Sequence, residues 1–475
     1  MTKLTAAAAA LLLLVSPNAS QAEDVPAMFG VSPARNMMSN ETGLPTEWDI
    51  DSGKNIKWQQ KLGSQTYAGP SVYKDWVFVG TNNEGERIEG LTGDKGVIMG
   101  FRASDGEFMW QATHDKLGAG RVNDWPLQGV CSTPYIENDR VYYLSNRAEM
   151  VAADLLGFSN GNDGFNGESY TGPQDADILW AFDTIGELDN FPHNLAASSP
   201  LIVGDLVYVT TGNGVDEGHL NIPSPLGPSF IAVDKNTGEL AWESALPGEN
   251  ILHGTWSNPT YGEAGGRAQV IFPGGDGWLY SFVPQTGELI WKFDTNPKDS
   301  RWELGGSGTR NNIISTAVFH DGKVYIGVGQ DPEHGEGPGH FYAIDASGTG
   351  DISSSGQVWH FGDDDFNRTI STAAIAGDML YITDLSGFLY ALELATGKHL
   401  WTHDTFAAVW GSPFVADGKI YLGDEDGDIV ILEAGREEKI IAEMNMGGAV
   451  YTTPVARDGV LYIATRADLF AIETE

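Results

Sequence analysis

Short apolar segments recur along the chain from about residue 55 to its end, and apolar and polar positions alternate within them. Alternation with a period of two is typical of β-strands that bury one face. Long stretches with the 3.6-residue spacing of an amphipathic helix are scarce. The pattern therefore predicts an all-β protein with many turns.

One pair of predicted strands repeats. "AVDKNTGELAW" (232–242) contains a strand, an Asn-Thr-Gly turn and a second strand that ends on Trp. Variants of this segment end at Trp110, Trp291 and Trp401, and interrupted versions end at Trp180 and Trp359. From Trp58 to Trp401 the successive Trp residues lie 52, 70, 62, 49, 68 and 42 residues apart, by subtraction. The spacing indicates a unit of about 40 residues with insertions.

A second pair of strands precedes each repeat, as in "SSPLIVGDLVYVTTGNG" (198–214), so every unit supplies four antiparallel strands. The last unit ends at "LFAIETE" after three strands, and the isolated strand 55–62 would complete it and close the ring. We therefore predict an eight-bladed β-propeller over residues 48–475. The eight units begin near Ala68, Val130, Ala196, Thr255, Ile313, Thr369, Val409 and Val450.

The repeat "AVDKNTGELAW" resembles the A-x-D-x-x-T-G-x-x-x-W repeat of the pyrroloquinoline-quinone (PQQ) propeller family, over roughly Trp48 to Glu475. The resemblance implies the propeller fold. It also implies one of two kinds of function, because the family includes quinoprotein alcohol dehydrogenases that hold PQQ and a metal ion in the central channel, and scaffolds without a cofactor. The chain is most similar to exported propeller proteins of this family that have no characterised activity.

The repeated residues themselves have structural roles. Gly in the turn adopts backbone angles that other residues resist, and the Trp of the outer strand is placed to pack against a neighbouring blade. A cofactor needs one site, whereas this motif recurs around the ring. Function is therefore expected where the units differ.

The innermost strands differ at the channel mouth. The units align on a Pro or Ala marker, and three positions upstream of it they carry Tyr67, Cys131, Ala197, Trp256, Ile314, Ile370, Trp410 and Tyr451. Around one arc of the channel mouth, nearby positions are rich in amide and basic side chains. Such a mixed concavity can bind an organic ligand by stacking and convergent hydrogen bonds, although a solvated channel wall is the alternative. The predicted binding residues are Gln128, Asn194, His253, Trp256, Arg310, Asn312, Arg368 and Trp410.

Three enlarged loops (82–97, 212–229 and 329–340) join second and third strands and should emerge on the same face as this mouth. Long loops on one face suggest a recognition surface. The third loop has the right chemistry for a divalent metal, although its spacing matches no defined site and a solvated loop is the alternative. Calcium is an alternative for the insertion 160–168, on the opposite face. The metal candidates are Asp331, Glu333, His334 and His340.

The N-terminal sequence and the composition indicate the location of the protein and the classes of partner it can have. Residues 1–22 combine Lys3, an apolar stretch and small residues before Glu23, which predicts a secretory signal cleaved near Ala22 and an N-terminal extension over 23–47. We expect a periplasmic or extracellular monomer without a membrane span. The formal charge of −38 disfavours nucleic acid and anionic membranes as partners. Cys131 is the single cysteine, so no disulfide or covalent haem forms within the chain.

Two functions fit this sequence. The favoured interpretation is a rigid binding or scaffold module, with a protein, glycan or small molecule bound at the channel mouth and the enlarged loops. The alternative, implied by the resemblance, is a PQQ- and calcium-dependent dehydrogenase that oxidises an alcohol or sugar. Three departures weigh against it: the adjacent-cysteine disulfide is missing, the sequence has no haem motif, and the aligned mouth offers amides and bases instead of carboxylates.

Overall fold

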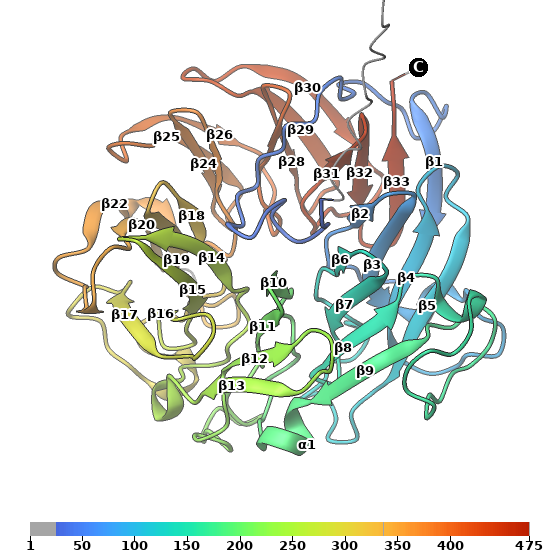
Figure 1. The fold of residues 1–475 in the computed structure, drawn as a ribbon. Coiled ribbons are helices and arrows are strands. Elements are labelled where there is room, and N and C mark those ends of the chain that lie inside the picture. Colours follow the sequence, from blue (N-terminus) through green and yellow to red (C-terminus); the bar gives the residue numbers. More distant parts are fainter. Residues whose placement is uncertain (1–24, 336, 475) are drawn as a thin grey trace, which may run out of the picture.

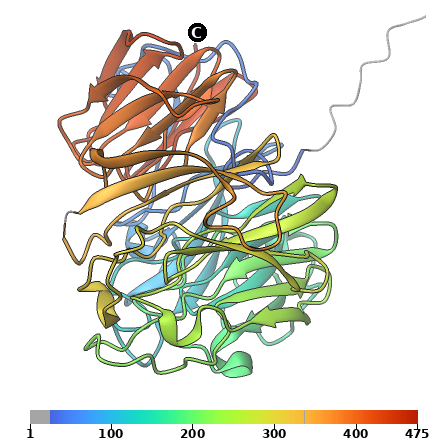
Figure 2. The same cartoon turned by 90° about the vertical axis from the view of Figure 1, so that its left-hand side faces the viewer.

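The computed structural model describes residues 25–335 and 337–474, and the predicted signal segment lies outside this range. The described residues form eight sheets arranged as a ring (Figure 1), seen from the side in Figure 2. Each sheet has four antiparallel strands, and one gains a fifth, parallel strand. The predicted eight-bladed β-propeller is confirmed.

Blades are numbered in chain order. The first two contain β2 (Ser71–Tyr73), β3 (Trp76–Asn82), β4 (Lys95–Arg102) and β5 (Phe108–Asp115), then β6 (Tyr135–Glu137), β7 (Arg140–Leu144), β8 (Glu149–Asp154) and β9 (Ile178–Asp183). The third contains β10 (Leu201–Val203), β11 (Leu206–Thr210), β12 (Phe230–Asp234) and β13 (Leu240–Ser244). The fourth contains β14 (Thr260–Ala264), β15 (Arg267–Pro273), β16 (Trp278–Phe282) and β17 (Leu289–Asp294), with β21 (Gly350–Asp351) added at its outer edge.

The fifth blade contains β18 (Val318–His320), β19 (Lys323–Val328), β20 (Pro338–Asp345) and β22 (Gln357–Asn367), and the sixth contains β23 (Ala374–Ala376), β24 (Met379–Thr383), β25 (Phe388–Glu393) and β26 (His399–Asp404). The seventh contains β27 (Phe414–Ala416), β28 (Lys419–Gly423), β29 (Asp428–Glu433) and β30 (Ile440–Asn445). The eighth contains β31 (Val455–Arg457), β32 (Val460–Ala464), β33 (Asp468–Ile472) and β1 (Ile56–Lys61).

Strand β1 pairs antiparallel with β33, so the first and last strands of the chain lie in one sheet. In Figure 1 the blue β1 lies beside the red β33. In the described part of the chain, helix is limited to α1 (Thr184–Leu188) and four single 3-10 turns, at Asn83–Gly85, Gly157–Ser159, Gly248–Asn250 and Leu304–Gly306. Within residues 25–335 and 337–474, no helix is both long and apolar enough to cross a bilayer.

The repeated Trp residues join neighbouring blades. Trp242 in β13 is buried, and its indole Nε1 donates a hydrogen bond of 2.7 Å to the carbonyl of Pro284 in the next blade. Gly287 follows in that blade with φ +67°, and a Cβ there would meet the Trp242 ring at 2.7 Å. The turn therefore needs Gly both for its backbone angle and for the ring of the preceding blade. Trp58, Trp110, Trp180, Trp359 and Trp401 make the same kind of bond to the next blade.

The segment 25–48 crosses the end of the channel opposite the enlarged loops. Arg35 is fully buried, and its guanidinium donates hydrogen bonds to the carbonyls of Phe29, Ser199, Pro200 and Pro259. Burial lowers the pKa of Arg35 to about 9, so the side chain is still charged at neutral pH. Main-chain and amide bonds tie the rest of the segment to five blades, at Ile136, Tyr261, Phe319, Ile375 and Val415.

Candidate functional site

The channel contains two cavities, one above the other. The outer pocket at the mouth has a volume of about 500 Å³, and the inner chamber has about 160 Å³. Both are lined by the eight residues that the alignment of the blades predicts, which form a ring between them. On its far side the inner chamber is lined by the crossing segment, including Phe29 and Met37. The ring consists of Tyr67, Cys131, Ala197, Trp256, Ile314, Ile370, Trp410 and Tyr451.

Aromatic side chains make one side of this ring. Tyr67 and Tyr451 stack with centroids 5.2 Å apart and planes 7° apart, and Trp410 meets Tyr451 at 70°. The indole Nε1 of Trp410 is buried and has no hydrogen-bond partner among the described residues. Cys131 also lines the pocket, but burial raises the pKa of its thiol to about 12, so it is a poor nucleophile.

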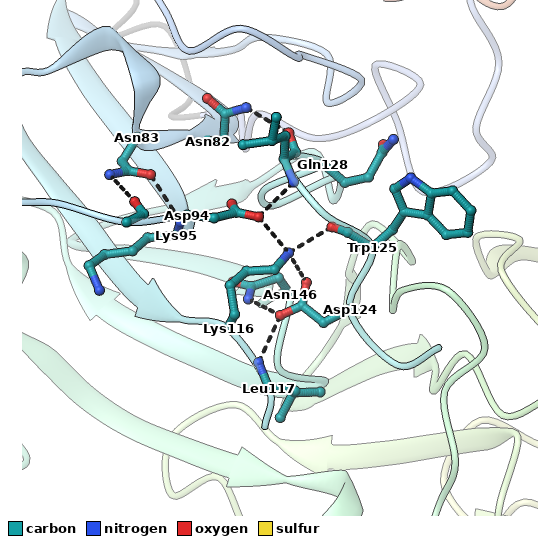
Figure 3. Close-up of polar contacts among 12 residues, drawn as sticks. Asn82, Asn83, Asp94, Lys95, Lys116, Leu117, Asp124, Trp125, Gln128 and Asn146 are labelled. Atoms are coloured by element: carbon teal, nitrogen blue, oxygen red, sulfur yellow. Dashed lines mark hydrogen bonds and ion pairs between the residues drawn. The ribbon is translucent and has the colours of Figure 1, made fainter. Parts of the chain in front are cut away.

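A buried polar network fixes the part of the rim that carries Trp125 and Gln128 (Figure 3). Lys116 contacts Asp124 and donates to the Trp125 carbonyl at 2.7 Å. Its Nζ lies 3.8 Å from Asp94, whose carboxylate accepts a 2.7 Å bond from the Leu127 main chain. The enlarged loop 82–97 is thereby tied to the connection between β5 and β6, which carries Trp125 and Gln128.

A histidine cluster lies beside the pocket, where loops of three blades meet. His193 lies between α1 and β10, and His219 lies in the enlarged loop between β11 and β12. His253 precedes β14, while Glu333 and His334 lie in the enlarged loop between β19 and β20. The rings of His219 and His334 each lie 4.6 Å from that of His253 between centroids. Two of the three enlarged loops therefore converge at this mouth.

Main-chain contacts fix the two buried members of the cluster. Gly214 forms a bridge to Gly254, and the main chain of Val215 donates to the His253 carbonyl at 2.9 Å. A Cβ on Gly214 would come within 2.4 Å of that carbonyl and within 2.7 Å of the His193 Cβ, so glycine is required for this approach. His193 and His253 are 2% and 0% exposed. Their positions are thus set by backbone and not by flexible side chains.

Hydrogen bonds orient both imidazoles. His253 Nδ1 lies 2.9 Å from Asp331 Oδ2, and His193 Nδ1 lies 2.7 Å from the Val215 carbonyl. The two Nε2 atoms face each other at 2.9 Å. Trp256 stands between the cluster and the pocket, with its ring perpendicular to that of His253 and its Nε1 bonded to the His193 carbonyl at 2.9 Å.

Three imidazoles of the cluster favour the neutral state. Burial, reinforced by the charge of His253, lowers the pKa of His193 to about 3. The same two causes lower the pKa values of His219 and His334. Burial would raise the pKa of Asp331, but its hydrogen bond to His253 and the charge of that ring outweigh this, so the pKa is lowered. Asp331 is therefore a carboxylate, and His193 offers a neutral nitrogen.

The structure brings several predicted residues together. Gln128, Asn194, Trp256 and Trp410 line the outer pocket, as do Asp331 and Glu333. His253 and His334 lie in the adjoining cluster, and the buried Asn312 donates to Asp331 at 3.4 Å.

Three predicted residues lie elsewhere. Arg310 forms a bidentate ion pair with Asp294 and lines a separate cavity of about 480 Å³ beside Trp278. Arg368 donates to the Gly335 carbonyl and is not part of the pocket lining. His340 is buried in β20, 3.1 Å from His360 Nε2.

The insertion 160–168 was a calcium candidate. Asp163 uses its main-chain N–H to bind Asp177 at 2.9 Å. Within the described residues, the groups of at least three His, Cys, Asp or Glu ligand atoms that could surround a metal are confined to the histidine cluster. His193 and His219 belong to that cluster, and the sequence argument had not selected them. Their signal was present, since both lie at the channel mouth or in an enlarged loop.

Comparison with known proteins places the chain among PQQ-type propellers. A family model described as "Outer membrane protein assembly factor BamB" matches residues 174–351 and 275–473. The structure of BamB from Moraxella catarrhalis superposes with a TM-score of 0.56 at 15% identity, covering 88% of this chain and 97% of that one. Quinohemoprotein alcohol dehydrogenase ADHIIG from Pseudomonas putida HK5 gives 0.61 at 14% identity, covering 94% and 80%. Identities this low establish the shared fold alone.

Two curated relatives match over shorter regions. Polyvinylalcohol dehydrogenase of Sphingopyxis sp. (strain 113P3) is 27% identical over 229 residues, which cover 42% of this chain and 33% of that protein. Quinohemoprotein alcohol dehydrogenase ADH IIB of Pseudomonas putida is 26% identical over 140 residues, covering 26% and 18%. The matched regions thus span a third or less of either relative.

Proposed function

The chain belongs to the family described as outer membrane protein assembly factor BamB, and from this premise we propose that it is an exported binding module that holds a small organic ligand at its channel mouth. The observation that carries the proposal is the outer pocket, an aromatic concavity of about 500 Å³ lined by Tyr67, Trp256, Trp410 and Tyr451. Its size is that of a small-molecule site. Export is supported by the signal pattern of residues 1–22.

The charge of the pocket defines the class of ligand. Asp331 and Glu333 are in the lining, and the described lining residues include neither Lys nor Arg. An anion placed there would face two carboxylates without a compensating cation, whereas a cation would be attracted. We therefore propose a neutral or cationic ligand with an apolar face that packs against Tyr67, Trp256 and Tyr451.

A matched series of probes tests this. Indole, tryptamine and indole-3-propionate share one ring system and differ in charge. Isothermal titration of the metal-free protein should give the tightest binding for tryptamine and the weakest for indole-3-propionate. We expect at least a 10-fold difference between the two, which corresponds to about 1.4 kcal/mol. Equal affinities, or a preference for the anion, would contradict the proposed pocket chemistry.

A pair of Trp variants locates the binding site. Trp410→Ala removes a ring from the pocket and should weaken tryptamine binding by 10-fold or more. Trp302→Ala is the matched control, because Trp302 is 42% exposed and lines the separate cavity near Arg310. If both variants bind tryptamine like the parent protein, the ligand does not occupy the channel mouth.

A second candidate function is a quinoprotein dehydrogenase, which the two curated relatives favour. The pocket does not fit PQQ, however, because the carboxylates of this cofactor would meet Asp331 and Glu333 with no Lys or Arg in the described lining. Calcium prefers oxygen ligands, while the cluster beside the pocket is mostly imidazole. Saturable PQQ binding in the presence of calcium, together with dye-linked alcohol oxidation, would replace the binding-module proposal with this second one.

A further inference from the structure

Two histidine nitrogens at the channel mouth face each other at 2.9 Å. His193 Nδ1 contacts the Val215 carbonyl, which can only accept, so this nitrogen carries the ring proton. His253 Nδ1 contacts the Asp331 carboxylate and carries the proton of the second ring for the same reason. In the neutral rings both Nε2 atoms then present lone pairs, 2.9 Å apart. This arrangement is repulsive unless a proton or a metal cation lies between them.

We propose that His193, His219, His253 and Glu333 bind a divalent first-row transition-metal ion such as Zn²⁺. The ligand atoms of these four side chains all lie within 4.8 Å of one another. Around a tetrahedral zinc with Zn–N bonds of about 2.0–2.1 Å, ligand atoms lie roughly 3.3 Å apart. His219 and Glu333 stand in loops and are partly exposed, so small rotations of their side chains complete the shell.

The surroundings of the two buried imidazoles match those of metal ligands in known sites. Metal-binding histidines commonly donate their second ring N–H to a carboxylate or a main-chain carbonyl, which fixes the ring and raises its basicity. Asp331 does this for His253 and is itself held by Asn312, and the Val215 carbonyl does it for His193. The outer shell of the site is therefore built into the rigid part of the propeller.

One more imidazole, that of His334, lies beside the four proposed ligands. His334 Nε2 is buried and has no hydrogen-bond partner, and its ring lies 4.6 Å from that of His253. This unpaired imidazole nitrogen is an additional potential ligand for the metal. With three or four imidazoles and one carboxylate available, the donors suit zinc, copper, nickel or iron, and do not suit calcium or magnesium.

One ligand borders the proposed binding pocket. Glu333 Oε2 lies 3.6 Å from His253 Nε2, while its Oε1 accepts a 3.0 Å bond from Asn194 in the pocket lining. The side chain of Glu333 is 45% exposed, unlike those of His193 and His253. Glu333 is therefore the ligand most easily replaced by a molecule in the pocket. The metal site goes beyond the proposed ligand binding and does not depend on it.

The competing explanation is that His253 is an imidazolium. It would then donate Nδ1–H to Asp331 and Nε2–H to His193, and the 2.9 Å contact would be an ordinary hydrogen bond. Such a pair needs no metal. The two explanations differ in whether the full-length protein, freed of metal by a chelator, takes up one zinc ion per chain.

The experiment is therefore a metal titration of the purified protein after chelator treatment. We expect one Zn²⁺ per chain by elemental analysis and by calorimetry, and visible bands of Co²⁺ bound by nitrogen when cobalt replaces zinc. His219→Ala should lower zinc affinity by at least 100-fold, more than the 10–100-fold typical of an outer-shell change. Glu333→Gln should lower it by at least 10-fold. Both side chains are partly exposed, so both variants should fold.

His399→Ala is the matched control, because His399 is exposed in β26 and bonds only locally, to Thr402. It should bind zinc like the parent protein. Absence of stoichiometric Zn²⁺ and Co²⁺ binding would overturn the proposal and favour the imidazolium. So would equal affinities of the His219→Ala and His399→Ala variants. Tryptamine binding, measured on the same metal-free sample, reports on the pocket separately, so failure of one proposal is distinguishable from failure of the other.

Discussion

Arg35→Met tests whether the crossing segment is held in place by one buried cation. The methionine keeps much of the volume but removes the four hydrogen bonds to the carbonyls of Phe29, Ser199, Pro200 and Pro259. Three of these acceptors belong to the third and fourth blades, and the change leaves them buried without a donor. The segment should detach from the ring far more often.

The size of the effect follows from those three bonds. Each unsatisfied buried acceptor costs about 1–3 kcal/mol, which gives roughly 3–9 kcal/mol in total. Removing an uncompensated buried charge offsets part of this by several kcal/mol. A net loss of about 4 kcal/mol corresponds to a rise of about 1,000-fold in the opening equilibrium of the segment.

Hydrogen exchange measured by mass spectrometry detects this opening of the crossing segment. Peptides covering residues 26–39 should lose protection by about three orders of magnitude, while peptides from the blades change little. Arg267→Met is the matched control, because Arg267 also donates to carbonyls, those of Ser347 and Gly348, but at a partly exposed site that water can reach. Unchanged protection of residues 26–39 in Arg35→Met would refute the reasoning.

Four further outcomes are expected. Gly287→Ala should lower the free energy of unfolding, measured with urea, by about 2 kcal/mol more than Gly204→Ala. Both glycines have positive φ, but only at Gly287 would a Cβ meet the Trp242 ring; equal losses would contradict this. Trp410→Phe should leave thermal stability unchanged or raised, since it removes an unpaired buried N–H; a clear loss of stability would contradict this. Burial raises the pKa of Asp276 to about 6, so the folded state holds its proton to higher pH than the unfolded state; the parent should lose about 2 kcal/mol relative to Asp276→Asn as pH rises from 4 to 6, and parallel stability profiles would contradict this. Saturation with Zn²⁺ should abolish the preference of the pocket for tryptamine over indole-3-propionate, and removal of zinc with a chelator should restore it; an unchanged preference would contradict this.

The fold could be predicted from sequence because the strongest signals are local and repeated. The strand pair that ends on Trp242 recurs in most blades, and in four blades the turn Gly lies against the Trp ring of the preceding blade. Trp291 is the exception, since its indole donates at 2.7 Å to Gln269 in its own blade. Its blade has β21 at the outer edge, and the sequence pattern does not predict this strand.

The candidate site was only partly predictable. Counting back from the marker of each blade located the whole ring of pocket residues, because position along the innermost strand sets the height in the channel. The convergence of His219 on His253 depends on the path of a long loop, which no local pattern specifies. Arg310 has the position of a mouth residue, yet its guanidinium turns away because Asp294 offers a bidentate carboxylate.

The crossing segment also constrains the order in which the molecule can be assembled. It is synthesised before any blade, yet Arg35 reaches acceptors 164–224 residues later, and Glu41 accepts a bond from Gly459, 418 residues away. Contacts this distant in sequence form late, since the intervening chain must first be ordered. The crossing segment therefore docks only after nearly the whole ring has formed. Its docking would mark the last step of folding, and a truncated or misassembled ring would leave it exposed to proteases.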